Sequence, residues 1–155
     1  EFLRKCNEHK ACTLHIIGGG ESKDLLISKL KECHVAVIDH NKIFEQEKKQ
    51  AVFDQCNYAL NVMKESVVVG LTMKSLDYLC GGVPMINTIP ADTAELVDEY
   101  NIGFNIDRET MDEVVEKICS MPLEEQFAQR ENCRKLYKTK FRDSSFEETL
   151  KSAGI

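Results

Sequence analysis

The chain has 155 residues, of which 43% are hydrophobic and 30% charged, and its formal net charge is −6 at pH 7. This length and composition are typical of one globular domain with a buried core. The negative charge argues against sequence-independent binding of nucleic acid, which requires clustered Lys and Arg, although a nucleotide pocket can still be locally positive.

We expect no targeting signal in the chain. Residue 1 already belongs to a helical pattern, and no apolar run approaches the roughly 20 residues that span a bilayer. We therefore expect a soluble, cytoplasmic domain, with at most a peripheral contact at the inner face of the membrane.

Short apolar strands alternate with helical patterns along the chain. Residues 1–10 predict a helix without a preceding strand, so we expect the interior of a longer polypeptide. Strands are predicted over residues 11–17, 34–39, 58–63, 83–87 and 103–106. Helices are predicted over residues 21–33 and 42–56, from about residue 71, over 92–100 and 109–120, and through a helical tail over 122–155. This order predicts right-handed crossovers and one doubly wound parallel sheet, a Rossmann-like α/β domain spanning residues 1–155.

Seven cysteines lie at irregular spacings, and no Cys-x-x-Cys motif is present. An odd number without a pattern does not indicate a disulfide framework. Several lie in apolar runs such as "LDYLC" and "EKIC", which is typical of buried free thiols in a reducing compartment.

Ligands of doubly wound sheets bind beyond the carboxyl ends of the strands, so the turn "IIGGGES" is the first candidate. Lys23 occupies the third glycine position of a dinucleotide fingerprint, and no P-loop lysine follows. The backbone N–H groups around Gly19 and Gly20 could bind an anion at a helix N-terminus. A tight strand-to-helix turn is the alternative.

Asp39 and His40 follow the second predicted strand in "IDHNK". The backbone of this loop could meet a flat base, whereas a solvated histidine is the alternative. His9, His15 and His34 lie in or beside predicted elements and show no pairing signal. No spacing indicates a metal site and no nucleophile-elbow motif occurs, so we predict no metal and assign no catalytic residue.

The stretch "GLTMKSLDYLCGGVPMIN", residues 70–87, joins a helix to a strand. If the helix begins near Leu71, Thr72 lies in its first turn beside free N–H groups, where the helix dipole favours a phosphate. Lys74 and Asp77 then share one face, and Asp77 could accept hydrogen bonds from a ribose diol. A surface salt bridge between the two side chains is the alternative.

Local patterns also predict how two helices are oriented and capped. Met73, Leu76 and either Leu79 or Cys80 should face the core. In the helix over residues 92–100, Asp92 is expected to cap the N-terminus and Glu95 to complete a capping box.

The same stretch resembles the signature G-L-P-x-K-x-x-E-Y-x-A-x-G-x-P-V-I in the C-terminal lobes of bacterial GT-B glycosyltransferases. "LHIIGGG" is similar to their L-x-I-x-G-x-G strand and loop, and "NYALNVMKES" to their A-D-x-x-x-x-P-S strand. "DTAELVDEYNIGFNI" is similar to their E-L-V helix and following strand. The resemblance covers about residues 12–106.

This resemblance implies a lobe that binds a nucleotide diphosphate sugar, with a UDP-sugar as the first expectation and no further cofactor. Asp77 would hold the ribose hydroxyls, Lys74 would stand at the signature lysine, and the turn over residues 70–73 would approach the diphosphate or sugar. The residues implied to bind the donor are Gly19, Gly20, Asp39, His40, Gly70, Thr72, Met73, Lys74 and Asp77.

The implied parent enzyme would transfer a hexose, with retention, to a saccharide or lipid-linked acceptor during surface polysaccharide synthesis. The acceptor lobe and the diphosphate-binding Arg and Lys would lie upstream, so the isolated domain should be inactive. Val69 stands where many relatives have a sugar-binding glutamate, and the loop "KESVVVG" is unusually apolar.

Two other functions fit the same pattern. One is a non-catalytic lobe that kept the fold and serves as a partner or scaffold, which Val69 favours. The other is a signalling receiver, which would need clustered acidic residues at its first strand end, where this chain has glycines.

Overall fold

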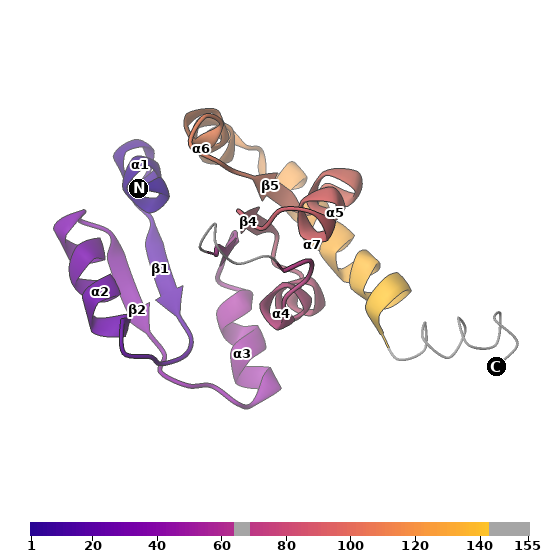
Figure 1. The fold of residues 1–155 in the computed structure, drawn as a ribbon, viewed down its shortest axis with the longest axis horizontal. Helices are drawn as coiled ribbons and strands as arrows, with labels where there is room; N and C mark the ends of the chain where they lie inside the picture. The colour runs from indigo at the N-terminus through magenta and orange to yellow at the C-terminus, as the bar shows by residue number, and fades with distance from the viewer. Residues whose placement is uncertain (64–68, 143–155) are drawn as a thin grey trace, which may run out of the picture. The chain divides into compact units, whose positions relative to one another are not determined.

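The computed structural model describes residues 1–63 and 69–142, which contain seven α-helices, five strands and one π-helical turn. The strands form two parallel sheets, β1-β2 and β3-β4-β5, so the α/β class with parallel strands is confirmed (Figure 1). The chain divides into two compact units: residues 1–52 with 108–121, and residues 53–107 with the chain from Pro122 onward. Residues 64–68 of the apolar loop and the expected helix near the C-terminus lie outside the described residues.

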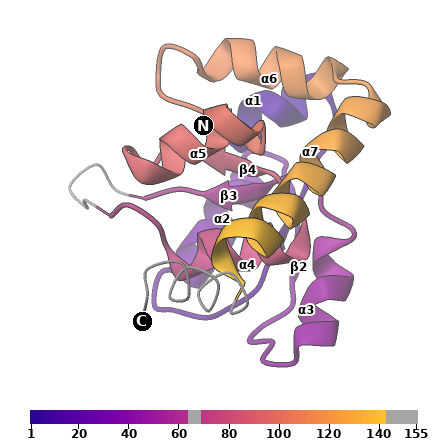
Figure 2. The same cartoon turned by 90° about the vertical axis from the view of Figure 1, so that its right-hand side faces the viewer.

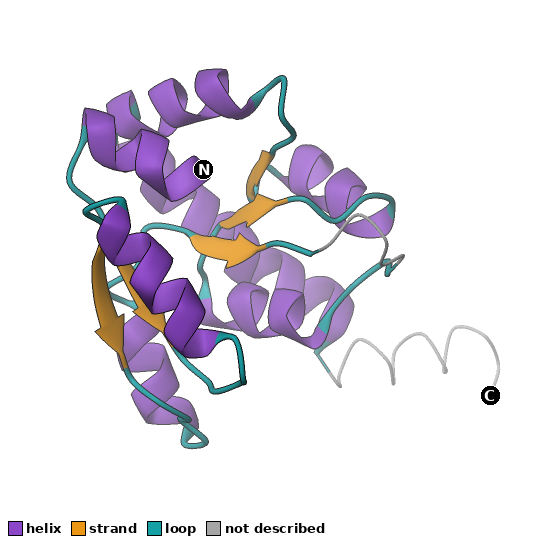
Figure 3. Cartoon of the chain, turned by 60° about the vertical axis from the view of Figure 1, so that its left-hand side comes forward, coloured by secondary structure: helices purple, strands orange, loops and turns teal. Residues whose placement is uncertain are grey.

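The first unit is a βαβ motif with additional helices. Its elements are α1 (Phe2–His9), β1 (Thr13–Ile16), α2 (Lys23–Glu32), β2 (Ala36–Asp39), α3 (Gln46–Phe53), which ends at the boundary, and α6 (Met111–Ser120). Strand β1 pairs in parallel with β2, from Thr13 opposite Ala36 to Ile16 opposite Asp39. Helix α2 lies against this sheet, as Figure 3 shows, and α1 packs on α6.

The second unit contains three parallel strands with two crossover helices. Its elements are β3 (Ala59–Asn61), α4 (Met73–Gly81), β4 (Met85–Asn87), α5 (Asp92–Tyr100), β5 (Gly103–Asn105), α7 (Leu123–Leu136) and the π-helical η1 (Tyr137–Phe141). The strands are aligned so that Ala59, Met85 and Gly103 are neighbours. Helix α7 packs against α4 and α5 (Figure 2).

Helix α7, expected only as a helical tail, completes the core of the second unit. Its Cys133 and Leu136 are buried together with Leu79 of α4, Met85 of β4 and Val97 of α5. Burying side chains of this size stabilises the fold by about 1.5–3 kcal/mol each. Removal of α7 would therefore expose the apolar face of α4.

The predicted start and orientation of α4 need correction. The helix begins at Met73, and Thr72 is its N-cap rather than a first-turn residue. Met73 is 77% exposed and Cys80 is exposed, so the prediction that Met73 faces the core is wrong. The fully buried residues Ser75 and Leu79 are four residues apart and define the true core face.

The predicted cap of α5 is also wrong. Ala91, not Asp92, is the N-cap, and it makes no side-chain cap. Its φ of 57° lies in the left-handed region, which is unusual for a residue with a Cβ. The carbonyl of Gly70 takes over the capping, because it accepts from the Thr93 backbone N–H at 3.2 Å.

The cysteines are all free, but fewer are buried than expected. Cys6 and Cys133 are buried, Cys80 is exposed, and the other four are partly exposed. The prediction of buried thiols therefore holds for two of the seven.

Gly103→Ala should strongly destabilise the second unit. Gly103 has a φ of 141°, and a Cβ there would collide with the Met85 backbone. We expect a loss of more than about 2 kcal/mol in the free energy of unfolding, measured by denaturant titration. Gly20→Ala is the control, because its Cβ meets nothing within 4 Å. An equal, small effect of both substitutions would contradict this packing.

Candidate functional site

The predicted site residues divide between the two units. The first unit contains Gly19, Gly20, Asp39 and His40, and the second contains Gly70, Thr72, Met73, Lys74 and Asp77. In each unit these residues lie in or beside the loops that follow the carboxyl ends of parallel strands, or on the helix that follows such a loop.

In the first unit, the turn after β1 is held against the loop after β2. The Gly18 N–H donates to the Asn41 carbonyl at 2.7 Å, and the His40 N–H donates to the Ile16 carbonyl at 2.9 Å. Gly18 needs its φ of 131°, whereas a Cβ on Gly20 would meet nothing within 4 Å. The backbone conformation therefore explains the glycine at position 18, whereas position 20 has room for a side chain.

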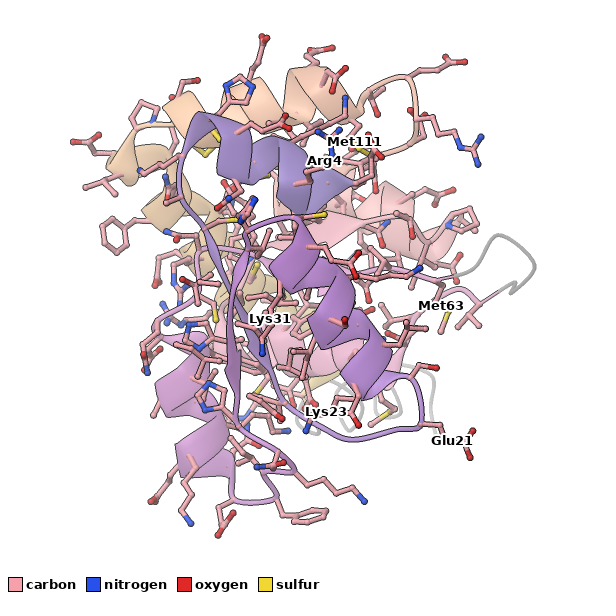
Figure 4. All side chains as sticks on the ribbon, turned by 90° about the vertical axis from the view of Figure 1, so that its left-hand side faces the viewer. Arg4, Glu21, Lys23, Lys31, Met63 and Met111 are labelled. Carbon is pink, nitrogen blue, oxygen red and sulfur yellow. The ribbon has the colours of Figure 1, made fainter. Side chains whose placement is uncertain are left out.

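Lys23, the first residue of α2, joins these two loops electrostatically (Figure 4). Its Nζ lies 2.6 Å from Asp39 Oδ2 and donates to the Asn41 side chain at 3.2 Å and the Gly18 carbonyl at 3.3 Å. The hydrogen bond from Lys23 lowers the pKa of Asp39, and the Asn41 N–H lowers it further. The Asp39 charge is thus balanced inside the loop pair.

His40 has a partner that the sequence did not indicate. Its Nε2 lies 3.0 Å from Nδ1 of His15 on β1, and the two rings stack with centroids 5.2 Å apart. Burial lowers the pKa of His15, and the neighbouring His40 lowers it further. The sequence around His15 carries no signal of this pairing. Only the alignment of β1 with β2 reveals the contact.

In the second unit, a row of asparagines joins the ends of the three strands. Asn61, Asn87 and Asn105 are aligned neighbours on β3, β4 and β5. Asn61 Nδ2 donates to Asn87 Oδ1 at 2.9 Å, and Asn87 Nδ2 donates to Asn105 Oδ1 at 2.8 Å. Asn105 Nδ2 donates to Asp98 Oδ1 of α5 at 2.9 Å. We call Asn61, Asn87 and Asn105 the asparagine row.

The asparagine row also fixes the N-terminus of α4. Asn61 Oδ1 accepts from the Ser75 hydroxyl at 3.3 Å and from the Thr72 hydroxyl at 3.5 Å. Thr72 Oγ1 in turn accepts from the Ser75 N–H at 3.1 Å, which caps the helix. The first turn of α4 is thereby bound to the carboxyl end of β3.

The turn before α4 is held against α5. The Gly70 carbonyl accepts from both the backbone N–H and the hydroxyl of Thr93. A Cβ on Gly70 would meet the carboxylate of the exposed Asp92 side chain, which would have to move. Gly70 therefore has a structural role beside the one that the resemblance implies.

The side chains expected to meet a ligand lie on the outer part of α4. Lys74 is exposed in the first turn, and Asp77 is half-buried one turn further along. Next to Asp77, burial raises the pKa of Tyr78 to about 12, and the Asp77 charge adds to that rise. Lys74 and Asp77 place a cation and an anion near the capped N-terminus of α4.

Sequence reasoning missed His15, Lys23 and the asparagine row. The row had a local signal, because each of three predicted strands contains an Asn in "ALN", "MIN" or "GFN". The sequence shows Lys23 only as a departure from a glycine fingerprint. Its pairing with Asp39 depends on the alignment of two strands.

No protein-family model, curated protein or solved structure matches this chain. Within residues 1–63 and 69–142, no helix is both long and apolar enough to cross a membrane. In the same residues, no group of three or more His, Cys, Asp or Glu side chains could hold a metal ion.

The histidine pair should make the first unit less stable at acid pH. The pKa of His15 is lowered on folding, so the unfolded chain binds its proton first as the pH falls below about 6.5. The free energy of opening of β1, measured by amide hydrogen exchange, should fall between about pH 7.5 and 5.5. His15→Gln should reduce this dependence. An NMR titration midpoint of His15 at or above about 6.5 would contradict the assignment.

Asn87→Ala should strongly destabilise the second unit. It removes the partner of the Asn61 amide, of Asn105 Oδ1 and of the Ile89 N–H, which Asn87 Oδ1 accepts at 3.1 Å. We expect a loss of about 2–4 kcal/mol in the free energy of unfolding, from denaturant titration. The control Asn57→Ala removes an exposed amide bonded to Gln126 and should cost under about 0.5 kcal/mol. Comparable losses in the two variants would disprove the importance of the row.

Proposed function

We propose that the chain is the donor-binding lobe of a GT-B fold glycosyltransferase, which transfers a hexose from a nucleotide diphosphate sugar to a saccharide or lipid-linked acceptor. The observation that carries the proposal is the capped N-terminus of α4 at the carboxyl end of β3, with Lys74 and Asp77 on that helix. This is the stretch whose sequence resembles the donor-binding signature.

The chemistry of α4 fits a nucleotide diphosphate. The partial positive charge at the helix N-terminus favours a phosphate, and Lys74 adds a full charge in the first turn. Such groups would stabilise the leaving diphosphate electrostatically. Asp77 lies one turn further in, where a carboxylate can accept from both hydroxyls of a ribose.

The proposal includes finer expectations. The parallel strands would belong to a doubly wound, Rossmann-like lobe, and the acceptor and any catalytic side chain would be supplied by a second lobe. Asp39, His40 and the glycine turn after β1 would contribute to binding the base and phosphate. A UDP-sugar is the expected donor, and the parent enzyme would act in bacterial surface polysaccharide synthesis.

One observation favours a second candidate, a non-catalytic lobe that serves as a scaffold. Val69 is a half-buried apolar residue at the position where the resemblance leads us to expect a sugar-binding glutamate. A valine cannot hydrogen-bond to a sugar. The two candidates differ in whether the chain binds a nucleotide at all.

Asp77→Ala should strongly weaken nucleotide binding. We expect one member of a panel of UDP, GDP, ADP, dTDP and CMP, at millimolar concentration, to give saturation-transfer NMR signals with the chain. Loss of a charge-assisted pair of hydrogen bonds should weaken this binding by about 10-fold or more. Asp77→Asn keeps the shape of the side chain but not its charge. Its affinity for the nucleotide should lie between those of the unaltered chain and Asp77→Ala.

Glu99→Ala is the matched control, because it removes an exposed carboxylate from α5 in the same unit. Glu99→Ala should bind the nucleotide with the same affinity as the unaltered chain. Nucleotide binding that Asp77→Ala leaves unweakened would refute the assigned ribose contact, and silence of the whole panel would favour the scaffold.

A further inference from the structure

The first residue of α5 places a carboxylate against the turn that precedes α4. If Gly70 carried a Cβ, that atom would meet Asp92 Oδ2, and Asp92 Cγ would lie 3.2 Å from it. The Asp92 carboxylate therefore occupies the space beside Gly70 that the absence of a side chain leaves open. Both residues belong to the second unit, so the contact lies within one compact body.

The backbone next to Asp92 is anchored to the same turn. The Gly70 carbonyl accepts from the Thr93 N–H at 3.2 Å and also from the Thr93 hydroxyl. Thr93 is fully buried, whereas Asp92 is exposed. The start of α5 is thus fixed against the turn while the carboxylate stays accessible from solvent.

The Asp92 carboxylate is free to meet a ligand. Over residues 1–63 and 69–142, no hydrogen bond or ion pair joins this carboxylate to another side chain. The dipole of α5 favours a negative charge in its first turn, where Glu95 also lies. That effect would act on any acid of the first turn, and it does not account for a carboxylate beside Gly70.

The position of Asp92 relative to α4 matches the size of a donor sugar. Gly70 precedes the N-cap Thr72 by two residues, so their Cα atoms lie at most about 7.6 Å apart. In a nucleotide diphosphate sugar the hexose is joined directly to the diphosphate, which the N-terminus of α4 would bind. A hexose there comes within reach of a carboxylate beside Gly70, whereas the neighbouring Val69 side chain has no acceptor to offer.

We propose that Asp92 binds the hexose of the donor by accepting hydrogen bonds from two adjacent sugar hydroxyls. This inference rests on the proposed function and names the residue of that site that recognises the sugar. A carboxylate repels a diphosphate, whereas neutral hydroxyls can donate to both of its oxygens. Asp92 therefore contacts the sugar, while Lys74 and the N-terminus of α4 hold the diphosphate.

The test compares each nucleotide with its sugar derivatives: UDP with UDP-glucose and UDP-galactose, and GDP with GDP-mannose. Dissociation constants come from NMR titrations of the isotopically labelled chain. We expect at least one nucleotide sugar to bind the unaltered chain more tightly than its own nucleotide does. Asp92→Ala should weaken binding of that sugar derivative by about 10-fold or more, because two charge-assisted hydrogen bonds are lost.

The same substitution should leave the affinity for the nucleotide alone unchanged or raise it, because it removes a negative charge near the diphosphate. Asp92→Asn keeps the size of the side chain and one acceptor oxygen. Its affinity for the nucleotide sugar should lie between those of the unaltered chain and Asp92→Ala. Glu99→Ala is the matched control, because it removes an exposed carboxylate from the same helix and should change neither affinity.

Two results would overturn this inference and leave the donor-binding lobe standing. One is that no nucleotide sugar binds more tightly than its nucleotide. The other is that Asp92→Ala changes the affinities for the nucleotide and for its sugar derivative by the same factor. If no nucleotide and no nucleotide sugar binds the chain, both the inference and the proposed function are wrong.

Discussion

The alignment of three parallel strands places Asn61, Asn87 and Asn105 side by side, and the second unit depends on the hydrogen bonds between them. A side-chain amide can donate and accept at once, so an asparagine can be hydrogen-bonded to neighbours on both sides. The first two are almost fully buried, where an unpaired amide would be costly. The row ends on Asp98 of α5 and on Ser75 of α4, so it orients both crossover helices.

Contacts between polar side chains of neighbouring strands and loops also hold the first unit together. Lys23 and Asp39 pair across the loops after β1 and β2, and His15 contacts His40 at 3.0 Å beside them. In each unit, polar side chains near the carboxyl ends of the strands bond to one another. Such preorganised groups cost little to arrange when a charged ligand binds, which is the property expected of a site and also of a rigid scaffold.

The alternation of elements was predictable because burial gives strands and helices different periods. All five strands and the seven helices of the described residues were anticipated, and α5 was placed at its observed bounds. The start of α4 was misplaced because Thr72 caps the helix, which leaves Met73 exposed. The cap of α5 was misassigned because the Gly70 carbonyl, distant in sequence, replaces the local side chain. Contacts such as His15–His40 depend on strand alignment, which a local pattern does not encode.

The central claim is that the N-terminus of α4, held by Asn61 and Thr72, is the anion-binding end of a nucleotide site. The most direct measurement is a titration of the isotopically labelled chain with UDP, following every backbone amide by NMR. The account predicts the largest saturable shifts at the amides of Met73 and Lys74, because the N–H groups of this first turn would point at the diphosphate, whereas the Ser75 N–H donates to Thr72. Saturable shifts confined to amides remote from α4, with Met73 and Lys74 unmoved, would contradict it.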